Sequence, residues 1–237
     1  MGLAIDYIRF IENAVEHRSF SGSAPLRMLE LGDQTIDEAA KLSEKTGKAY
    51  FEARSYQHTS VDLNGMNGAL VLDLTQPEQF TQFLGQFDVV TNSGTTEHVE
   101  PLEKQYESFL IIHQCLKVGG VAVHIVPDAV SHDTDGMWRG HCPFYYTAEF
   151  FDMLAAENGY VMIENTVING LRAAAFVKAA DRPFMEDRKR LTDAIAVRSG
   201  GASYGYLHKK SKGAKLIRRI KKSATRLTPR TWRACRK

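Results

Sequence analysis

The sequence is poor in cysteine and has no long apolar run. Its three cysteines, Cys115, Cys142 and Cys235, lie far apart and form no C-x-x-C pair, which argues against a disulfide framework and against a thiolate zinc site. No apolar stretch approaches the roughly 20 residues that a membrane span requires. The G-x-G-x-x-G signature of nicotinamide dehydrogenases is absent as well. These absences, with an ordinary apolar fraction of 43%, favour a globular, cytoplasmic protein.

Acidic residues are missing from 209–237, which holds thirteen of the 30 Lys and Arg residues. The rest of the chain therefore carries 17 basic against 28 acidic residues, although the net charge of the whole is only +2. Leu216, Ile217, Ile220 and Leu227 can share one face of a helix here. A basic amphipathic helix predicts contact with an anionic membrane, peripheral to its inner face. An arm that binds RNA phosphates and a disordered end stay open as alternatives.

Most of five short segments run from apolar residues into an acidic or small residue, as buried parallel strands with polar tips do. The strands are expected at 26–31, 58–62, 69–74, 87–92 and 121–126. Helices are expected at 4–17, 36–45 and 101–117, from Pro77, and from Thr147, its N-cap, to Gly159. Asn169-Gly170 between 160–168 and 171–178 predicts a β-hairpin. The fold class is therefore α/β.

Two blocks carry a resemblance to a known family. Phe87-Asp88-Val89-Val90 leads to Glu97-His98-Val99, and Leu116-Lys117-Val118-Gly119-Gly120 precedes the fifth strand. Over roughly 26–178 the chain resembles the class I S-adenosylmethionine-dependent methyltransferases of the small-molecule type. The resemblance implies a Rossmann-like, doubly wound, mostly parallel seven-stranded sheet with an antiparallel C-terminal hairpin and helices on both faces.

The resemblance divides the chain into four parts and implies S-adenosyl-L-methionine as the cofactor. The parts are an N-terminal helix at 1–22, the cofactor-binding methyltransferase domain at 23–180, an extension at 181–208 and the basic amphipathic tail at 209–237. Ligands of open α/β sheets bind outside the carboxyl ends of the strands. The cofactor is therefore expected at the strand tips.

The resemblance implies that the tips of the first four strands each offer a group that suits one part of this cofactor. Asp62 can accept both ribose hydroxyls, while Asp73 can take the adenine amino group with Leu74 packing on the ring. Gly32 lets the backbone approach the methionine end, which Glu30 orients. Residues at the end of the fourth strand can line the sulfonium and the acceptor without blocking them, and they are Asn92, Ser93 and Gly94.

The first loop departs from the family pattern, which has two or three glycines where this chain has only Gly32. We expect Asp33, Gln34 and Thr35 to replace the missing glycines, through side-chain hydrogen bonds or the N-terminus of the following helix. This departure leaves open a member of the fold that has lost catalysis.

The predicted catalytic residues are His98 and His141, which are placed to act on an acceptor that must lose a proton. Glu97 and His98 can instead cap or solvate the helix that follows. The aromatic residues of the same region either wall the acceptor pocket or pack the loop down, and they are Trp138, Phe144, Tyr145 and Tyr146. No metal site is predicted, because one set of candidate ligands fits no spacing template. That set is His124, Asp128, His132, Asp133, Asp135 and His141.

The predicted function is methyl transfer to a small-molecule, saccharide or lipid-linked acceptor at oxygen. One alternative is a catalytically silent binding or scaffold protein. Another is an RNA methyltransferase that uses the basic tail, which the acidic body of the chain makes less favourable.

Overall fold

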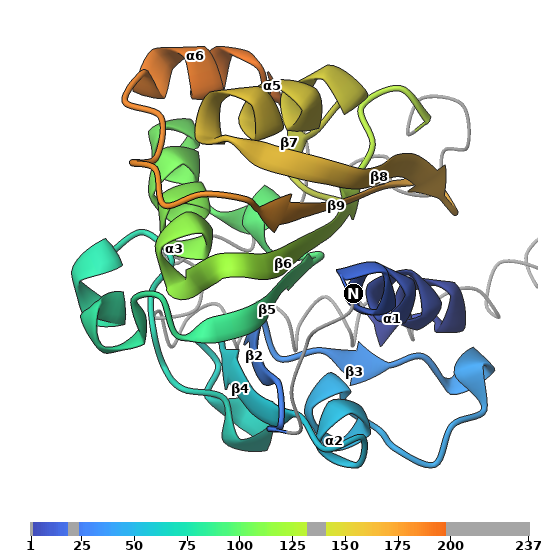
Figure 1. The fold of residues 1–237 in the computed structure, drawn as a ribbon. Helices are drawn as coiled ribbons and strands as arrows, with labels where there is room; N and C mark the ends of the chain where they lie inside the picture. The colour runs from blue at the N-terminus through green and yellow to red at the C-terminus, as the bar shows by residue number, and fades with distance from the viewer. Residues whose placement is uncertain (1, 19–23, 132–140, 198–237) are drawn as a thin grey trace, which may run out of the picture. The chain divides into compact units, whose positions relative to one another are not determined.

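A six-stranded β-sheet forms the centre of the molecule, and helices cover both of its faces (Figure 1). The structure, a computed structural model, describes residues 2–18, 24–131 and 141–197. The strand order is β4-β2-β5-β6-β9-β8. The first four of these strands are parallel, and β9 is antiparallel to both of its neighbours. This topology confirms the predicted Rossmann-like fold with its antiparallel hairpin.

The sheet consists of β2 Arg27–Leu31, β4 Gln57–Val61, β5 Phe87–Ser93, β6 Leu116–Pro127, β8 Tyr160–Ile168 and β9 Leu171–Lys178. The α-helices are α1 Ile5–Arg18, α2 Gly47–Glu52, α3 Gln105–Cys115, α5 Ala148–Asn158 and α6 Arg188–Asp193. Two short strand pairs join β1 Gly2–Leu3 to β3 Thr35–Ile36 and β7 Phe144–Tyr145 to β10 Ala196–Val197. The 3-10 helices are η1 Glu38–Ala40, η2 Met66–Gly68, η3 Pro77–Phe83, η4 Thr96–His98 and η5 Leu102–Lys104.

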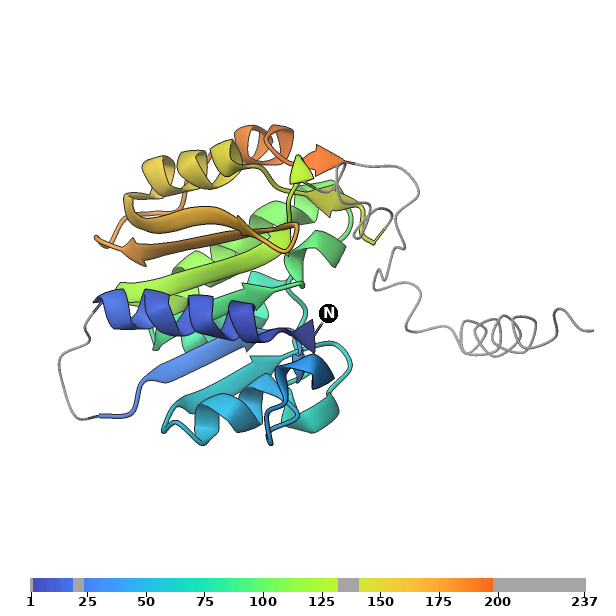
Figure 2. The ribbon, with the colours of Figure 1, turned by 90° about the vertical axis from the view of Figure 1, so that its right-hand side faces the viewer.

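Two apolar layers hold the sheet, because successive residues of each central strand point to opposite faces. Met28 and Val89 belong to the layer that α1 and α2 cover, and their neighbours Leu29 and Val90 belong to the layer under α3 and α5. All four side chains are buried. Figure 2 shows α1 running along the near face of the sheet, with α3 lying beyond it. Burial of both faces explains why these strands read as apolar runs.

The structure confirms two predictions from short-range sequence signals, which are the turn of the β-hairpin and the caps of α5. Asn169 and Gly170 have φ values of 51° and 75°, as the tight turn between β8 and β9 requires. Thr147 caps α5 by accepting the N–H of Phe150 at 3.2 Å, and Gly159 ends this helix at φ 66°.

The predicted strand at 69–74 is wrong, so the sheet has six strands and not seven. Leu70 makes one isolated bridge, donating to Ser60 O at 2.8 Å and accepting from Asp62 N at 3.0 Å. The Leu72 N–H then bonds back to Leu70 O at 3.0 Å, which turns the chain away from β4. Val71 is 65% exposed. With its apolar side chain in solvent, this segment gains little from pairing.

The predicted helix at 36–45 is also wrong. The segment enters β3 and η1 and then turns at Lys41, whose φ is 54°. The helix starts later, at Gly47, because the Thr46 side chain accepts the N–H of Ala49 at 3.1 Å and caps it. The short helix expected from Pro77 forms as the 3-10 helix η3.

The C-terminal predictions are only partly within the described residues. Residues 181–197 of the predicted extension contain α6 and β10, whereas 198–208 and the tail 209–237 lie outside the described residues. No helix among the described ranges is long and apolar enough to span a membrane.

Candidate active site

The parallel strands end level with one another, which brings the segments that follow them to one edge of the sheet. Leu31 at the end of β2 lies opposite Val61 of β4 and Asn92 of β5. Ser93 at the end of β5 lies opposite Ile125 of β6. This carboxyl edge is where an open α/β sheet binds its ligand.

The loop after β2 is held to both neighbouring loops by hydrogen bonds. Gly32 donates to Val61 O at 2.8 Å, and Thr95 Oγ1 donates to Leu31 O at 2.7 Å. Gly32 has a φ of +87°, and a Cβ there would lie 2.5 Å from both Gln34 Nε2 and Thr95 Oγ1. Only glycine fits this position. The Gln34 amide itself donates to Thr95 Oγ1 at 3.3 Å, so its side chain lies over the single glycine.

Asp62 follows β4 and is oriented toward the same loop. Its Oδ2 accepts the Asp33 N–H at 3.1 Å, and its Oδ1 accepts the Asn64 N–H at 2.8 Å. The Asp33 carboxylate in turn accepts from Asn67 Nδ2 at 2.8 Å. Each carboxylate oxygen has two acceptor sites, so a carboxylate at this position suits a pair of hydroxyls. The structure thus brings together Gly32, Asp33 and Asp62.

Glu30 lies inside the molecule, behind this loop. It is 2% exposed and accepts the backbone N–H of Gln34. Its Oε2 is 3.6 Å from Nε2 of His58, which is also buried. Burial raises the pKa of Glu30 well above its ordinary value. Burial also lowers the pKa of His58 to about 4, so this imidazole is neutral at pH 7. Contact of Glu30 with the methionine end stays a prediction, and what the structure adds is its support of the loop through Gln34.

Asp73 and Leu74 lie in a tight turn after the isolated bridge. The Asp73 carboxylate accepts from Thr75 N at 2.9 Å, from Thr75 Oγ1 at 2.8 Å and from Gln76 Nε2 at 3.3 Å. Leu74 packs in the layer under α3, where its carbonyl accepts from Ser108 Oγ at 3.1 Å. Their predicted contact with adenine stays a prediction.

The end of β5 positions η4 through Asn92. The Asn92 amide donates to Thr96 Oγ1 at 2.8 Å and accepts the Thr96 N–H at 3.2 Å, and its Nδ2 also lies 3.2 Å from Nδ1 of His124. Ser93 is 3% exposed, and Gly94 donates to Ile125 O at 2.9 Å with a φ of 65°. Asn92 therefore fixes the turn that follows the strand.

Two further residues lock η4 from the other side. Gln105 Nε2 donates to the carbonyls of Thr96 and Val99, each at 2.7 Å. The Tyr146 hydroxyl donates to Gln105 Oε1 at 2.7 Å and lies 3.0 Å from Thr96 Oγ1. Tyr146 is itself tied to the end of β6, because its N–H donates to Pro127 O at 3.0 Å. This buried network connects η4, α3 and the segment before α5.

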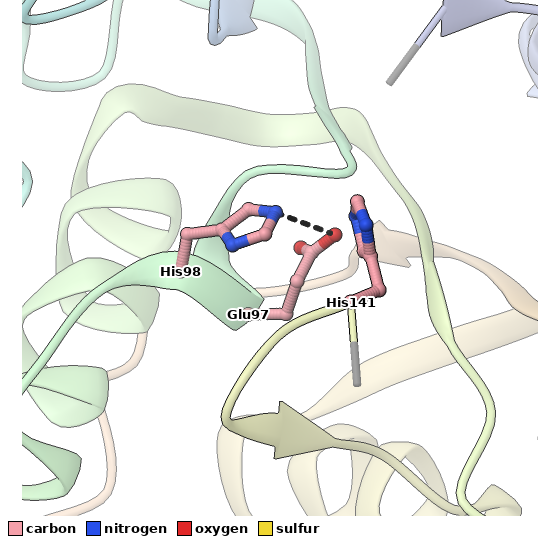
Figure 3. Close-up of side chains that lie close together, drawn as sticks. All are labelled: Glu97, His98 and His141. Atoms are coloured by element: carbon pink, nitrogen blue, oxygen red, sulfur yellow. Dashed lines mark ion pairs between the residues drawn. The ribbon is translucent and has the colours of Figure 1, made fainter. Parts of the chain in front are cut away.

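Glu97, His98 and His141 converge next to this network (Figure 3). The Glu97 carboxylate lies between the two imidazoles, whose ring centroids are 4.9 Å apart. His98 Nε2 is 3.9 Å from Glu97 Oε1. The Glu97 side chain is fully buried, and no other described residue donates a hydrogen bond to either of its oxygens. Burial raises the pKa of Glu97 to about 8, so the carboxyl is mainly protonated at neutral pH.

The structure thus unites the two predicted catalytic histidines and adds Glu97. Sequence spacing did not predict this, because His141 comes from the segment before β7 and the pair Glu97-His98 from η4. The signal available was the Glu97-His98 pair itself, for which a role as a helix cap remained open. The aromatic residues Phe144, Tyr145 and Tyr146 are buried, which supports packing of the loop, while Trp138 lies outside the described residues.

The residues rejected as a metal set are dispersed where the structure describes them. His124 is enclosed by the rings of Phe109, Phe151 and Phe176. Asp128 is fully buried and accepts from Arg172 Nε at 2.8 Å. His141 lies instead with Glu97 and His98, and the remaining candidates lie outside the described residues, namely His132, Asp133 and Asp135.

No family model and no curated protein matches the chain. Among solved structures, the chain is similar to a 1,6-didemethyltoxoflavin-N1-methyltransferase of Burkholderia thailandensis with bound S-adenosylhomocysteine. The two share 16% identity over 72% of this chain and 79% of that chain, with a TM-score of 0.47. The chain is similar to the PH0226 protein of Pyrococcus horikoshii OT3, at 12% identity over 73% and 89% of the two chains, with a TM-score of 0.49. A third is an O-methyltransferase family protein of Burkholderia thailandensis, at 11% identity over 75% and 59%, with a TM-score of 0.47. Similarities this low carry no functional argument, so function has to rest on the residues of the site.

Proposed function

We propose that the chain is an S-adenosylmethionine-dependent methyltransferase that acts on an oxygen of a small-molecule, saccharide or lipid-linked acceptor. One observation carries the proposal. The carboxylate of Asp62, oriented by the N–H of Asp33, lies at the same carboxyl edge as the convergent side chains of Glu97, His98 and His141. The first arrangement suits a ribose diol, and the second suits a hydroxyl that must lose a proton.

The order of the strands supports separate places for the cofactor and for the acceptor along the carboxyl edge of the sheet. Asp62 follows β4 and Gly32 follows β2, so the cofactor occupies this side, with its methionine end at Gly32 and Asp33. Ser93 and Gly94 follow β5, in the middle of the edge, where the sulfonium lies. The histidines come next, toward β6. In this arrangement the transferable methyl group points toward the acceptor, as in-line transfer requires.

Calorimetry with S-adenosylmethionine tests the cofactor assignment. Asp62→Asn keeps the shape of the side chain but removes the charge that accepts hydroxyl hydrogen bonds. A charge-assisted hydrogen bond contributes about 1.5–3 kcal/mol, so we expect binding to weaken about 10- to 100-fold. The matched control is Asp88→Asn, which changes a carboxylate at the opposite end of β5, where Asp88 bonds Lys117 and the Arg27 N–H. Absence of binding in the wild type, or equal loss in both variants, would refute the assignment.

A catalytically silent binding protein is the second candidate, because the Gln34 side chain lies over Gly32 where the family has further glycines. Tight binding of S-adenosylmethionine without turnover across a broad panel of hydroxyl acceptors would favour it. Gln34→Gly separates the two candidates further, since it opens the loop without touching the histidines. Turnover by the wild type on any acceptor of the panel excludes the silent form.

A further inference from the structure

We propose that Glu97, His98 and His141 form a binding site for a divalent transition-metal ion of the Zn²⁺ type, which holds the acceptor hydroxyl. The role of the ion at the acceptor rests on the proposed function, whereas the binding site itself does not. The argument starts from the donor atoms. Two imidazoles and one carboxylate converge so that one ligand atom of each lies within 4.8 Å of the others.

This spacing is close to what one ion imposes. Ligand atoms at about 2.0–2.2 Å from a tetrahedral ion lie roughly 3–4 Å from one another. The distance between His98 Nε2 and Glu97 Oε1 is already 3.9 Å. We expect side-chain rotations to close the remaining difference and to bring all three atoms onto one ion.

The second observation is that the carboxyl group of Glu97 is buried without a hydrogen-bond donor among the other described residues. Its side chain is fully buried, points between the two imidazole rings (Figure 3) and receives no hydrogen bond from any other described residue at either oxygen. A buried carboxyl group without partners is costly. A cation placed between Glu97 and the imidazoles supplies the missing partner, and this need separates the cluster from an ordinary group of surface side chains.

The surrounding network gives the site the rigidity that metal binding favours. Asn92, Gln105 and Tyr146 fix Thr96, which directly precedes Glu97. Tyr146 donates a backbone hydrogen bond to the end of β6. His141 lies in the same short segment as Tyr146, which precedes α5. Ligands held by locked neighbours lose little entropy when the ion binds.

The donor set selects the kind of cation. Imidazole nitrogens suit Zn²⁺, Fe²⁺, Co²⁺ and Ni²⁺, whereas Mg²⁺ and Ca²⁺ prefer sites built from oxygen. Two His and one Glu also leave a coordination position open, which is the arrangement of catalytic zinc sites. The open position can take the oxygen of an acceptor hydroxyl.

A metal here changes the role of the two histidines from bases to ligands. The ion lowers the pKa of the bound hydroxyl, and the hydroxyl proton passes to solvent. The oxygen lone pair then forms the new O–CH₃ bond while the S–CH₃ bond breaks and its electron pair stays on sulfur. The products are the methyl ether and neutral S-adenosylhomocysteine.

Calorimetry on the full chain, freed of metal with EDTA, tests the site with ZnCl₂ as titrant. We expect binding of one Zn²⁺ that weakens by at least about a hundredfold in His98→Ala and in His141→Ala, more than a change in a supporting residue causes. The control is His17→Ala, which removes an exposed histidine from α1. MgCl₂ is expected to bind far more weakly. Titration with CoCl₂ adds a spectroscopic signature, because a His₂Glu site gives Co²⁺ a visible absorption that both site variants lose.

Absence of Zn²⁺ binding, or equal affinity in the site variants and the control, would overturn the proposal. Glu97→Gln controls for misfolding of the alanine variants, because it keeps the shape of the side chain. This variant is also expected to bind Zn²⁺ more weakly. S-adenosylmethionine binding is measured on the same EDTA-treated protein. Cofactor binding without zinc binding refutes the metal site alone, and zinc binding without cofactor binding refutes the methyltransferase alone.

Discussion

At the scale of single residues, three histidines of the described part of the chain lie in the interior, and burial keeps them neutral. Burial lowers the pKa of His58 and of His113 to about 4, and that of His124 to about 3. In the unfolded chain each takes up a proton near pH 6.5. Between that pH and the folded pKa the unfolded state binds more protons, so the free energy of unfolding falls as pH falls. The protein is therefore expected to be sensitive to mild acid.

His124→Leu tests this expectation at the deepest of the three positions. Between pH 7 and pH 5 the wild type loses about 2 kcal/mol of stability through His124, and the variant keeps this amount. The leucine leaves one Asn92 N–H unpaired and so lowers stability at pH 7, but the pH dependence is the readout. Urea unfolding at several pH values measures it, with His17→Leu as the exposed control. Equal pH dependence in wild type and His124→Leu would contradict the prediction.

The residue types at the site could be predicted from the sequence, but the convergence of Glu97, His98 and His141 in space could not. His98 and His141 stand out because histidine is the usual proton-transfer residue. Glu97 has an ordinary explanation in a helix cap, and only the folded chain shows it fully buried between two rings. Asp128 illustrates the reverse case. It stood in the set of candidate metal ligands whose spacing fits no template, and the fold pairs it with the guanidinium of Arg172 at 2.6 Å.

At the scale of elements, α2 forms in place of the helix predicted at 36–45, and its first residue packs against a buried carboxyl group. Gly47 begins α2 and donates to Gln34 O at 2.9 Å, which ties the helix to the cofactor loop. A Cβ on Gly47 would lie 2.2 Å from Glu30 Oε1 and 3.1 Å from Leu3 Cδ1. The glycine is therefore needed for close approach of the helix to Glu30.

Gly47→Ala is expected to destabilise the protein by about 1–3 kcal/mol, because the new methyl group overpacks this contact. Helix propensity alone predicts the opposite sign, since alanine is favoured over glycine by about 1 kcal/mol. Thermal or urea unfolding decides between the two. Gly85→Ala is the comparison, as nothing lies within 4 Å of a Cβ there and only its φ of +60° costs energy. A stabilised Gly47→Ala variant would refute this account of α2.

Elements with strong local chemistry were predictable, and elements that depend on neighbours were not. The hairpin at Asn169-Gly170 and the cap at Thr147 follow from short-range preferences, and both formed at the expected residues. The segment at 69–74 has a strand-like composition, but Val71 stays 65% exposed, so pairing there would bury little apolar surface. The segment at 36–45 has helix-forming residues, yet the capping bond of Thr46 places the start of the helix after it.

At the scale of the whole molecule, charge is divided between an acidic body and the basic segment 209–237. The body carries 17 basic and 28 acidic residues, while the segment carries thirteen cations and no acid. A uniformly basic nucleic-acid enzyme would distribute its cations over the catalytic domain as well. We therefore propose that the basic segment attaches the protein to an anionic lipid surface.

Removal of 209–237 is accordingly expected to abolish binding to anionic vesicles. Each cation near such a surface contributes about 1 kcal/mol, an attraction that salt screens. Cosedimentation should therefore show the full chain bound to vesicles of phosphatidylserine and phosphatidylcholine, unbound to phosphatidylcholine alone, and released as salt rises. The double variant Leu216→Ser, Ile220→Ser keeps every charge but removes two apolar side chains. Partial loss of vesicle binding in this variant indicates that the segment inserts as an amphipathic helix. Binding to RNA that depends on 209–237, with no binding to either vesicle, would instead assign the segment to the phosphate backbone of an RNA acceptor.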